Sequence, residues 1–258
     1  MPEADIALLA EAARAAGKIA TRYFKRDLKA WDKPGSQGPV TEADLEVDTM
    51  LRETLGAARP DYGWLSEETP DAPSRLSATR VFIVDPIDGT RAFIEGNPTW
   101  SHSLAVAEDG DVIAAAVYLP IHDKLYLAGR GEGATLNNLP ITASDRVDVT
   151  GAEVLAARPA MDPEHWHEGT PPELKRQFRS SLAYRMALTA EGRKDAMLTL
   201  RPTWEWDVAA GTLLVTEAGG AATDRTGAPL RFNNPTPQVR GVVAGGRHVQ
   251  SGLIQNLA

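Results

Sequence analysis

The chain of 258 residues contains no cysteine and only five histidines. Without cysteine there is no disulfide, no thiolate metal site and no cysteine nucleophile. The chain also lacks a Gly-x-Ser-x-Gly segment, the turn that presents a serine nucleophile in many hydrolases. Only His165 and His167 have the spacing of metal ligands, and their loop is rich in proline and tryptophan, which favours solvated side chains. The composition therefore offers no candidate for covalent catalysis by cysteine or by such a serine.

Long apolar runs and clusters of positive charge are missing as well. No stretch reaches the roughly 18 apolar residues that a membrane-spanning helix needs. The first residues, Met-Pro-Glu-Ala-Asp-Ile, are charged and lack the apolar core of a signal peptide. The net charge of −8, without a Lys/Arg cluster longer than a few residues, argues against a nucleic-acid surface. We therefore expect a cytoplasmic protein that binds neither a nucleic acid polymer nor a membrane.

An apolar run at 81–84 (Val-Phe-Ile-Val) leads directly into the hexapeptide 85–90 (Asp-Pro-Ile-Asp-Gly-Thr). Four β-prone residues predict a buried strand, and Pro86 is expected to end it. The alternative is an ordinary turn, because Asp-Pro and Asp-Gly are common turn dipeptides. On the first interpretation, the end of a strand carries two carboxylates three residues apart, followed by a glycine and a hydroxyl.

These side chains suit a magnesium phosphate site. The carboxylates of Asp85 and Asp88 are hard oxygen ligands, and Mg²⁺ usually keeps several waters and also binds substrate phosphate. Gly89 lets the backbone approach an anion closely, and Thr90 offers a hydroxyl to a metal-bound water. The hexapeptide therefore predicts metal-assisted chemistry on a phosphate.

The spacing of apolar residues predicts helices at 3–29 and, after a breaker-rich loop at 31–39, from Thr41 to Gly56. The second helix begins with a capping box, in which Asp44 follows Thr41 by three residues. Short β-prone runs then predict an antiparallel sheet that the first helices cover, with a hairpin turn at Asp109-Gly110. Its expected strands are 62–65, 81–84, 103–107, 112–119 and 124–128.

A polar, breaker-rich stretch from Pro159 to Pro172 suggests a domain boundary near residue 150. We expect an N-terminal α+β metal-binding domain over 1–150. A C-terminal α/β domain over 151–258 would complete the active site. Its expected elements are helices at 182–190 and 208–218 and strands at 196–200 and 241–244.

Three further acidic positions accompany the hexapeptide: Glu67 after the run at 62–65, Asp207 at the start of an Ala-rich helix, and Asp44. Each has a structural alternative. Asp207 could be an N-cap, Asp44 could merely complete the capping box, and Glu67 could be a solvated loop charge. Clustered carboxylates without a metal, however, repel one another and raise one another's pKa. Their joint occurrence therefore favours a metal site.

The chain resembles the inositol monophosphatase superfamily of Mg²⁺-dependent, Li⁺-sensitive phosphatases. The first family motif, Asp-Pro-Ile/Leu-Asp-Gly-Thr, matches 85–90 at every position, and the second, Trp-Asp-x-Ala-Ala/Gly-Gly/Ala, matches 206–211. Glu67-Glu68 and a Val-Thr-x-x-Asp pattern at 40–44 match as well. The resemblance covers nearly the whole chain. It implies a five-layered αβαβα sandwich of the α+β class, usually a homodimer.

The resemblance also implies two to three Mg²⁺ ions per active site. Glu67, Asp85 and the backbone carbonyl of Ile87 resemble ligands of the first ion. Asp85, Asp88 and Asp207 resemble ligands of the second. All of these positions carry an oxygen ligand in this chain.

Further roles follow from the same resemblance. Asp44 would support a third, weaker ion or its waters together with Glu67. Thr90, with Asp44 or Glu67, would orient and deprotonate the attacking water. The backbone N–H groups of Gly89 and Thr90 would hold the phosphate. The expected substrate-binding residues are Asp88, Gly89, Thr90, Arg201 and Asp207.

The chain departs from the family at the expected inositol contact. Inositol monophosphatases usually have a glutamate about seven residues before the second-motif aspartate, and this chain has 199–202 (Thr-Leu-Arg-Pro) there. The loss of that acceptor for sugar hydroxyls weakens the inositol assignment. Arg201 and the run at 202–207 resemble bacterial 3'(2'),5'-bisphosphate nucleotidases instead. Arg201 would bind a second phosphate and Trp204 would stack on a base. Alternatively, Arg201 is a solvated charge and Trp204 packs in the core.

We expect a hydrolase that attacks a small phosphorylated metabolite with metal-activated water. The preferred substrate is a nucleotide of the adenosine 3',5'-bisphosphate type. Inositol 1-phosphate and histidinol phosphate are alternatives, because 91–95 lacks the Lys-Glu-Phe of the nucleotidases and 90–93 resembles histidinol-phosphatases. The non-enzymatic alternative is a regulator that binds a macromolecule. A degraded metal set would favour that alternative, whereas every ligand position is filled here.

Overall fold

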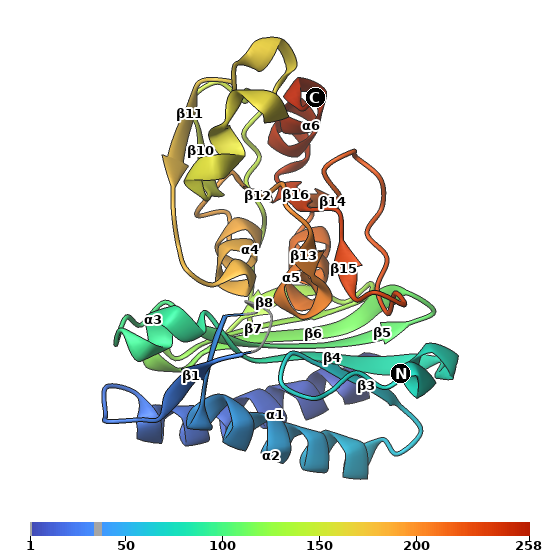
Figure 1. Ribbon diagram of the computed structural model, residues 1–258. Helices are drawn as coiled ribbons and strands as arrows, with labels where there is room; N and C mark the ends of the chain where they lie inside the picture. Colours follow the sequence, from blue (N-terminus) through green and yellow to red (C-terminus); the bar gives the residue numbers. More distant parts are fainter. Residues whose placement is uncertain (1, 34–37) are drawn as a thin grey trace.

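The computed structural model describes residues 2–33 and 38–258, which form five layers in the order αβαβα (Figure 1). The five-layered sandwich expected from the sequence is therefore confirmed. The α-helices are α1 (Pro2–Tyr23), α2 (Glu42–Ala58), α3 (Thr90–Ile94), α4 (Leu182–Ala190), α5 (Glu205–Glu217) and α6 (Arg247–Asn256). Short 3-10 helices span Pro73–Ser77, Pro120–His122, Arg158–Met161, Pro163–His165 and His167–Gly169.

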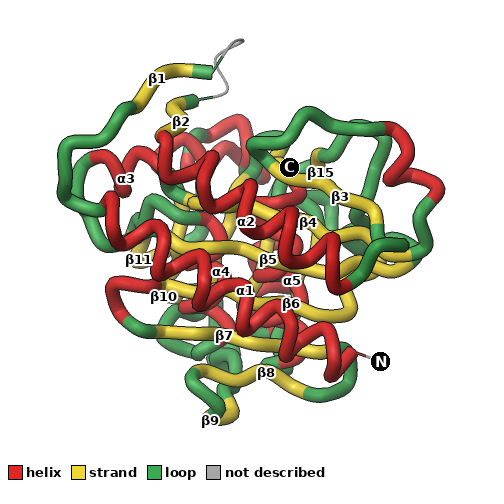
Figure 2. Tube along the Cα trace, turned by 90° about the horizontal axis from the view of Figure 1, so that it is seen from below, coloured by secondary structure: helices red, strands yellow, loops and turns green. Residues whose placement is uncertain are grey.

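The larger sheet has seven strands in the order β3-β4-β5-β6-β7-β8-β9. Helices α1 and α2 cover one of its faces (Figure 2), and α4 and α5 cover the other (Figure 1). The neighbours are antiparallel except β3 and β4, which are parallel, so the prediction of a wholly antiparallel sheet is wrong at that edge. The strands are β3 (Gly63–Ser66), β4 (Arg80–Asp88), β5 (Ser101–Glu108), β6 (Asp111–Leu119), β7 (Lys124–Gly129), β8 (Gly133–Leu136) and β9 (Leu139–Pro140).

The smaller sheet has five strands in the order β11-β10-β12-β16-β14. It lies beyond α4 and α5, and α6 packs on its outer side (Figure 1). Two-stranded ribbons join β1 (Ala30–Asp32) with β2 (Pro39–Thr41) and β13 (Thr203–Trp204) with β15 (Gln238–Val239). The sheet strands are β10 (Ala152–Ala156), β11 (Leu174–Gln177), β12 (Ala196–Thr199), β14 (Ala221–Thr223) and β16 (Val242–Gly245).

Strand β4 continues past Pro86, contrary to the prediction that the strand ends at Val84. The pairing with β5 is regular from Arg80 to Asp85, is irregular between Asp85 and Asp88, and resumes at Asp88. Proline is tolerated at such an irregularity because no ladder hydrogen bond is required from its nitrogen. The irregularity leaves both aspartates on one strand, with Pro86 and Ile87 between them.

Other helices and strands begin or end a few residues away from their predicted boundaries. Helix α1 ends at Tyr23 rather than near 29, and α2 continues to Ala58, two residues beyond Gly56. The predicted loop at 31–39 contains parts of β1 and β2, while 34–37 lie outside the described residues. Helix α5 begins at Glu205, so Asp207 is its third residue and not its N-cap. The capping box at Thr41, the hairpin turn at 109–110 and the helix at 182–190 are confirmed.

One apolar core cluster joins the two sheets through α4 and α5. It includes Ile83 of β4, Met186 of α4, Leu214 of α5 and Ala244 of β16. Helices α4 and α5 are therefore fixed from both sides, and functional side chains at their ends are held rigidly. The division of the chain at residue 150 stays a prediction. Among the described residues, no helix is long and apolar enough to cross a membrane.

Candidate metal centre

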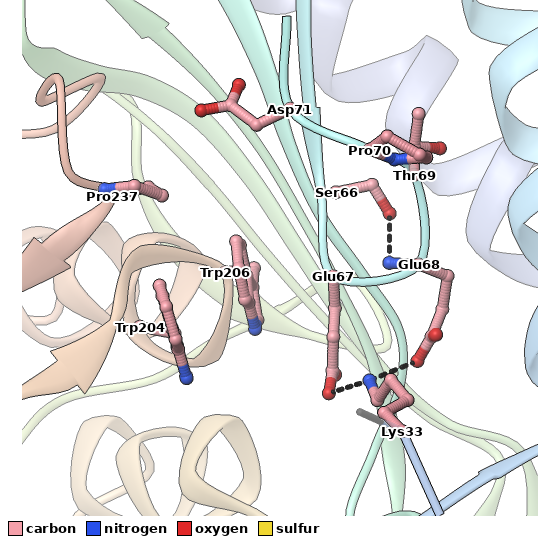
Figure 3. Close-up of a pocket in the computed structure, with 10 residues that line it drawn as sticks. All are labelled: Lys33, Ser66, Glu67, Glu68, Thr69, Pro70, Asp71, Trp204, Trp206 and Pro237. Atoms are coloured by element: carbon pink, nitrogen blue, oxygen red, sulfur yellow. Dashed lines mark hydrogen bonds and ion pairs between the residues drawn. The ribbon is translucent and has the colours of Figure 1, made fainter. Parts of the chain in front are cut away.

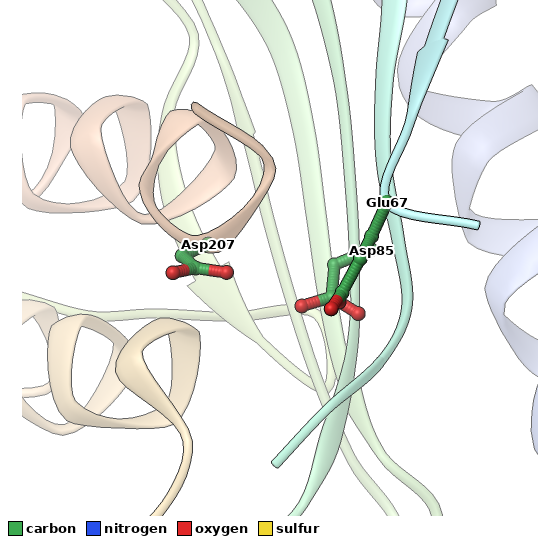
Figure 4. A group of neighbouring side chains, drawn as sticks. All are labelled: Glu67, Asp85 and Asp207. Carbon is green, nitrogen blue, oxygen red and sulfur yellow. The ribbon is translucent and has the colours of Figure 1, made fainter. Parts of the chain in front are cut away.

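Three carboxylates meet where β3, β4 and α5 converge (Figure 4). Glu67 follows the last residue of β3, Asp85 lies on β4, and Asp207 lies in the first turn of α5. One oxygen from each lies within 4.8 Å of the others. We call these three residues the acidic wall. Such a group of carboxylates could hold a metal ion.

Local structure explains why these side chains converge. Strands β3 and β4 are parallel, so their carboxyl ends lie at the same edge of the sheet, and the amide of Glu67 donates to the carbonyl of Val84 at 3.2 Å. Asp207 lies at the positive end of the α5 dipole, where a carboxylate is stabilised. Residues more than a hundred positions apart are thereby fixed around one point.

The acidic wall is electrostatically strained without a cation. Burial raises the pKa of Asp85 well above its usual value, and the negative charges of Glu67, Asp88 and Asp207 raise it further. Burial raises the pKa of Asp207 well above its usual value as well, with Asp88 adding to the effect. Among residues 2–33 and 38–258, the buried Oδ1 of Asp85 has no hydrogen-bond partner. This set of carboxylate oxygens, in which Oδ1 of Asp85 is unpaired, fits a hard cation such as Mg²⁺.

Asp88 and the acidic wall line one cavity, but the carboxylate of Asp88 contacts the start of α4. Its Oδ2 accepts hydrogen bonds from the Ser181 hydroxyl at 2.5 Å and the Ala183 amide at 2.6 Å, and its Oδ1 accepts one from the Leu182 amide at 3.3 Å. Burial raises the pKa of Asp88 to about 6, although these hydrogen bonds act in the opposite direction. Asp88 is thus fixed by α4 and does not belong to the three closest carboxylates.

Asp44 and Thr90 are brought together from α2 and α3. The Thr90 hydroxyl lies 3.3 Å from Oδ1 of Asp44 and 3.1 Å from the carbonyl oxygen of Ile87, so it can donate to either. Asp44 also completes the capping box, because its Oδ2 accepts the Thr41 amide at 2.9 Å. Burial raises the pKa of Asp44 to about 6, against the effect of the Thr41 contacts. Asp44 therefore contacts Thr90 in addition to capping α2.

Gly89 precedes α3 with a φ of 97°, a conformation that L side chains rarely adopt. A β-carbon there would lie 3.3 Å from the carbonyl oxygen of Thr99 and 3.4 Å from the side chain of Ser181. The backbone angle therefore favours glycine, and the carbonyl of Thr99 leaves little room for a side chain. Gly89 thus connects β4 to α3, and it lines the same cavity as Asp88.

Lys33 is a site residue that sequence reasoning missed. Its ammonium group donates to Oε1 of Glu67 at 2.6 Å and to Oε1 of Glu68 at 2.9 Å (Figure 3). Burial lowers the pKa of Lys33, but the two glutamates outweigh this effect and raise it overall. The only signal was a single lysine in a breaker-rich loop. A contact across 34 residues could not be predicted from that.

The acidic wall, Asp88 and Thr90 line one cavity of about 720 Å³. Arg201 lines it too and is exposed, which fits both the predicted substrate contact and the alternative of a solvated charge. Arg185 of α4 also lines this cavity, and it was not predicted. A second cavity of about 430 Å³ adjoins at Glu67 and Trp204 (Figure 3). There the ring of Trp204 stacks on Trp206, with centroids 4.8 Å apart and planes 9° from parallel.

Comparison with known proteins agrees with this geometry. A model described as the inositol monophosphatase family matches residues 2–258. An inositol-1-monophosphatase of Mesorhizobium japonicum is 31% identical, covering 96% of this chain and 94% of its own. A histidinol-phosphatase of Chlorobaculum parvum is 32% identical over 86% of each chain. The crystal structure of the extragenic suppressor protein suhB from Bartonella henselae has a TM-score of 0.84 at 28% identity, covering 98% of this chain and 97% of that one.

Proposed function

The chain belongs to the inositol monophosphatase family of phosphatases, and from this premise we propose that it hydrolyses small phosphate monoesters with Mg²⁺ bound at the acidic wall. The observation that carries the proposal is the convergence of Glu67, Asp85 and Asp207 around an unpaired buried oxygen of Asp85. Carboxylates at this spacing repel one another unless a cation lies between them. A cation site fits the geometry better than a structural role does.

Two to three Mg²⁺ ions would be held by the acidic wall, with Asp88 and the Ile87 carbonyl as further oxygen ligands. When bound, Mg²⁺ offsets the charge of the phosphate and lowers the pKa of water. The chain itself holds the oxygen atoms that would bind the metal in fixed positions. Asp88 is fixed by α4, and the Ile87 carbonyl is fixed by its contact with Thr90.

Thr90 and Asp44 are the proposed acceptors of the water proton. The Thr90 hydroxyl can accept a hydrogen bond from the attacking water while it donates to Asp44. Asp44, a buried carboxylate in contact with the Thr90 hydroxyl, would then take up this proton. Glu67 is the alternative base, because it lies in the same cavity. The amides of Gly89 and Thr90, at the start of α3, would hold the phosphate oxygens.

The substrate proposal remains a nucleotide of the adenosine 3',5'-bisphosphate type. Arg201 lines the same cavity as the proposed metal ligand Asp207, so it could contact a second phosphate of a substrate bound there. Trp204 lines both cavities. One face of Trp204 is covered by Trp206, so a base would stack on the other face. Inositol 1-phosphate and histidinol phosphate stay as alternatives, because relatives named for those activities are 31% and 32% identical.

A regulatory role through a macromolecular partner is the second candidate, since one structural relative is named a suppressor protein. The complete acidic wall favours the enzyme. We also propose a homodimer, which the family resemblance implies. Li⁺ sensitivity is proposed on the same basis.

A phosphomonoester panel tests the proposal. Phosphate release from adenosine 3',5'-bisphosphate, inositol 1-phosphate and histidinol phosphate is measured as kcat/KM with Mg²⁺ and with a chelator. We expect turnover that requires Mg²⁺ and prefers the bisphosphate. Absence of Mg²⁺-dependent release from all three would refute the phosphatase proposal. A tenfold preference for inositol 1-phosphate would replace the nucleotide by inositol phosphate.

A further inference from the structure

Arg185 is a buried cation with few partners. Its side chain lies in the wall of the 720 Å³ cavity, and the residue is only 5% exposed. Its Nε donates to the carbonyl oxygen of Arg179 at 2.6 Å. Within the described parts of the chain, 2–33 and 38–258, its guanidinium has no other hydrogen-bond acceptor and no carboxylate within 4.0 Å. Both terminal nitrogens are therefore left for a ligand.

Leaving this cation unpaired is unfavourable. Burial lowers the pKa of Arg185 to about 10, and the nearby positive charge of Arg201 acts in the same direction, whereas Asp88 and Asp207 oppose it. A buried charge normally has a partner, because removal from water otherwise costs several kcal/mol. Here a second positive charge, that of Arg201, acts on Arg185 as well. Arg185 and Arg201, which we call the basic wall, therefore gather positive charge beside the acidic wall.

We propose that Arg185, assisted by Arg201, binds a second oxyanion of the substrate, a phosphate or a carboxylate on the leaving group. The proposal rests on the proposed phosphatase function and narrows its substrates to phosphomonoesters that carry a further negative charge. Arg185 is then the main anchor for this group, and Arg201 is the outer one.

The geometry of Arg185 is preorganised for such a contact. Its Cζ lies 4.5 Å from the centroid of the Phe178 ring, and the hydrogen bond to Arg179 fixes Nε. The guanidinium plane is thus held from two sides. Two terminal nitrogens in a fixed plane match two oxygens of a phosphate or carboxylate.

Helix α4 also holds Asp88, which lines the cavity together with the acidic wall, and carries Arg185 of the basic wall. The amides of Leu182 and Ala183 hold Asp88, and Arg185 lies two residues beyond Ala183 on the same helix. Both contacts therefore move with one rigid element. Both walls line the same cavity, so a substrate with anionic groups at two ends would face both of them.

The rival interpretation is that Arg185 only offsets the charge of Asp88 and Asp207 and never contacts the substrate. On that interpretation, replacing Arg185 weakens turnover of all phosphomonoesters alike. A direct contact predicts a selective loss for substrates with the second oxyanion. The ratio of two kcat/KM values separates these cases, because a general structural effect cancels in the ratio.

The experiment uses two matched pairs of substrates with saturating Mg²⁺. Adenosine 3',5'-bisphosphate differs from adenosine 3'-monophosphate only in a phosphate, and 3-phosphoglycerate differs from glycerol 3-phosphate in a carboxylate. For wild type we expect at least about a tenfold preference for the doubly charged member of one pair. The pair that shows it identifies phosphate or carboxylate as the bound group. Arg185→Gln should reduce this preference by about 10–100-fold, the range for a charge-assisted contact.

Three further variants complete the design. Arg185→Lys keeps a positive charge and should restore part of the preference. Arg201→Gln, at an exposed position where folding is not at risk, should reduce it by about 3–10-fold. Arg193→Gln makes the same charge change outside the cavity and should keep the wild-type ratio.

Two outcomes overturn the inference while the phosphatase proposal survives. One is Mg²⁺-dependent turnover by wild type with no preference in either pair. The other is an equal loss for both members of each pair in Arg185→Gln, with the ratio unchanged in Arg201→Gln. If none of the four compounds is hydrolysed with Mg²⁺, the proposed function itself fails.

Discussion

The acidic wall and the basic wall line the same cavity and carry opposite charges, yet they do not pair with each other. Within residues 2–33 and 38–258, no ion pair within 4.0 Å joins the basic wall to Glu67, Asp85 or Asp207. Within the acidic wall only Glu67 has an ion-pair partner among the described residues, because Lys33 contacts it at 2.6 Å. Asp85, Asp207 and the basic wall have no such partner in that part of the chain. This is the arrangement expected where cations bind on one side and anions on the other.

The walls also differ in how firmly they are built. Asp85 is 1% exposed on a paired strand, whereas Arg201 is exposed and its only side-chain hydrogen bond among the described residues goes to the carbonyl oxygen of Pro202 at 3.5 Å. Arg185 is intermediate in how firmly it is held: it is buried, and Phe178 and Arg179 contact its guanidinium. Rigid carboxylates suit a metal with strict geometry, and a looser arginine suits substrates of different length.

The largest effect should come from the acidic wall itself. Asp85→Asn removes one charge from the point where three carboxylates meet, and we expect kcat to fall at least about 10³-fold, equivalent to roughly 4 kcal/mol. Without metal, the same change should raise the free energy of unfolding, because the variant removes a buried charge that Glu67 and Asp207 repel. Initial rates and denaturation in chelator measure both quantities.

Asp61→Asn makes the same change at an exposed position outside the cavity and serves as the control. It should alter neither kcat nor stability beyond a few tenths of a kcal/mol. If Asp85→Asn keeps near-normal turnover, the acidic wall does not hold the catalytic metal. If it lowers activity but also destabilises the metal-free protein, the electrostatic account of this wall is wrong.

The next effect concerns His102, which contacts β4 between Asp85 and Asp88. His102 of β5 is fully buried, and its Nδ1 forms a hydrogen bond with the carbonyl of Pro86, between the two aspartates of β4. Burial lowers the pKa of His102 to about 4. The unfolded imidazole, near 6.5, takes up its proton first as pH falls. The stability that His102 contributes is therefore intact above pH 6.5 and is lost toward pH 4, by about 3 kcal/mol.

His102→Asn keeps a donor near the position of Nδ1 but does not titrate in this range. The difference in unfolding free energy between wild type and this variant should shrink by about 3 kcal/mol from pH 7 to pH 4. All other titrating groups cancel in that difference. A difference that does not change with pH would mean that His102 is not buried in its neutral form.

A smaller effect is expected at the proposed water contact. Thr90→Ala removes the hydroxyl that contacts Asp44 and Ile87, and we expect kcat to fall about 10²-fold with little change in KM. Thr90→Ser keeps the hydroxyl and should retain most of the activity. An unchanged kcat with a raised KM in Thr90→Ala would assign Thr90 to phosphate binding alone.

The acidic wall could be predicted from the sequence because its chemistry follows local signals. Asp85 comes directly after an apolar run, and Asp207 stands at the start of an Ala-rich helix, so each position was visible in a short window. The parallel pairing that brings Glu67 beside Asp85 was not predicted. Strand direction depends on long-range packing, which a short window does not contain.

The basic wall could be predicted only in part. Arg201 was found because it lies close to a motif, whereas Arg185 lies inside α4, all nine residues of which are buried. One signal was present: a single charge in the apolar segment Leu-Ala-Tyr-Arg-Met-Ala-Leu. A buried arginine in a helix indicates a special site, but its partner cannot be read from neighbouring residues. The roles of all these residues stay predictions.

The smallest effect concerns the contact between α5, which carries Asp207 of the acidic wall, and α4, which carries Arg185 of the basic wall. Gly211 of α5 faces Met186 of α4, and a β-carbon there would lie 2.5 Å from the Met186 Cβ. Gly211→Ala therefore forces α4 and α5 apart and should lower the free energy of unfolding by about 1–3 kcal/mol. Gly56→Ala is the matched control, because a β-carbon at Gly56 of α2 meets nothing within 4 Å and alanine favours a helix by up to about 1 kcal/mol. Chemical denaturation should give opposite signs for the two variants. Equal effects on the free energy of unfolding would show that the packing of Gly211 against Met186 does not set the spacing of α4 and α5.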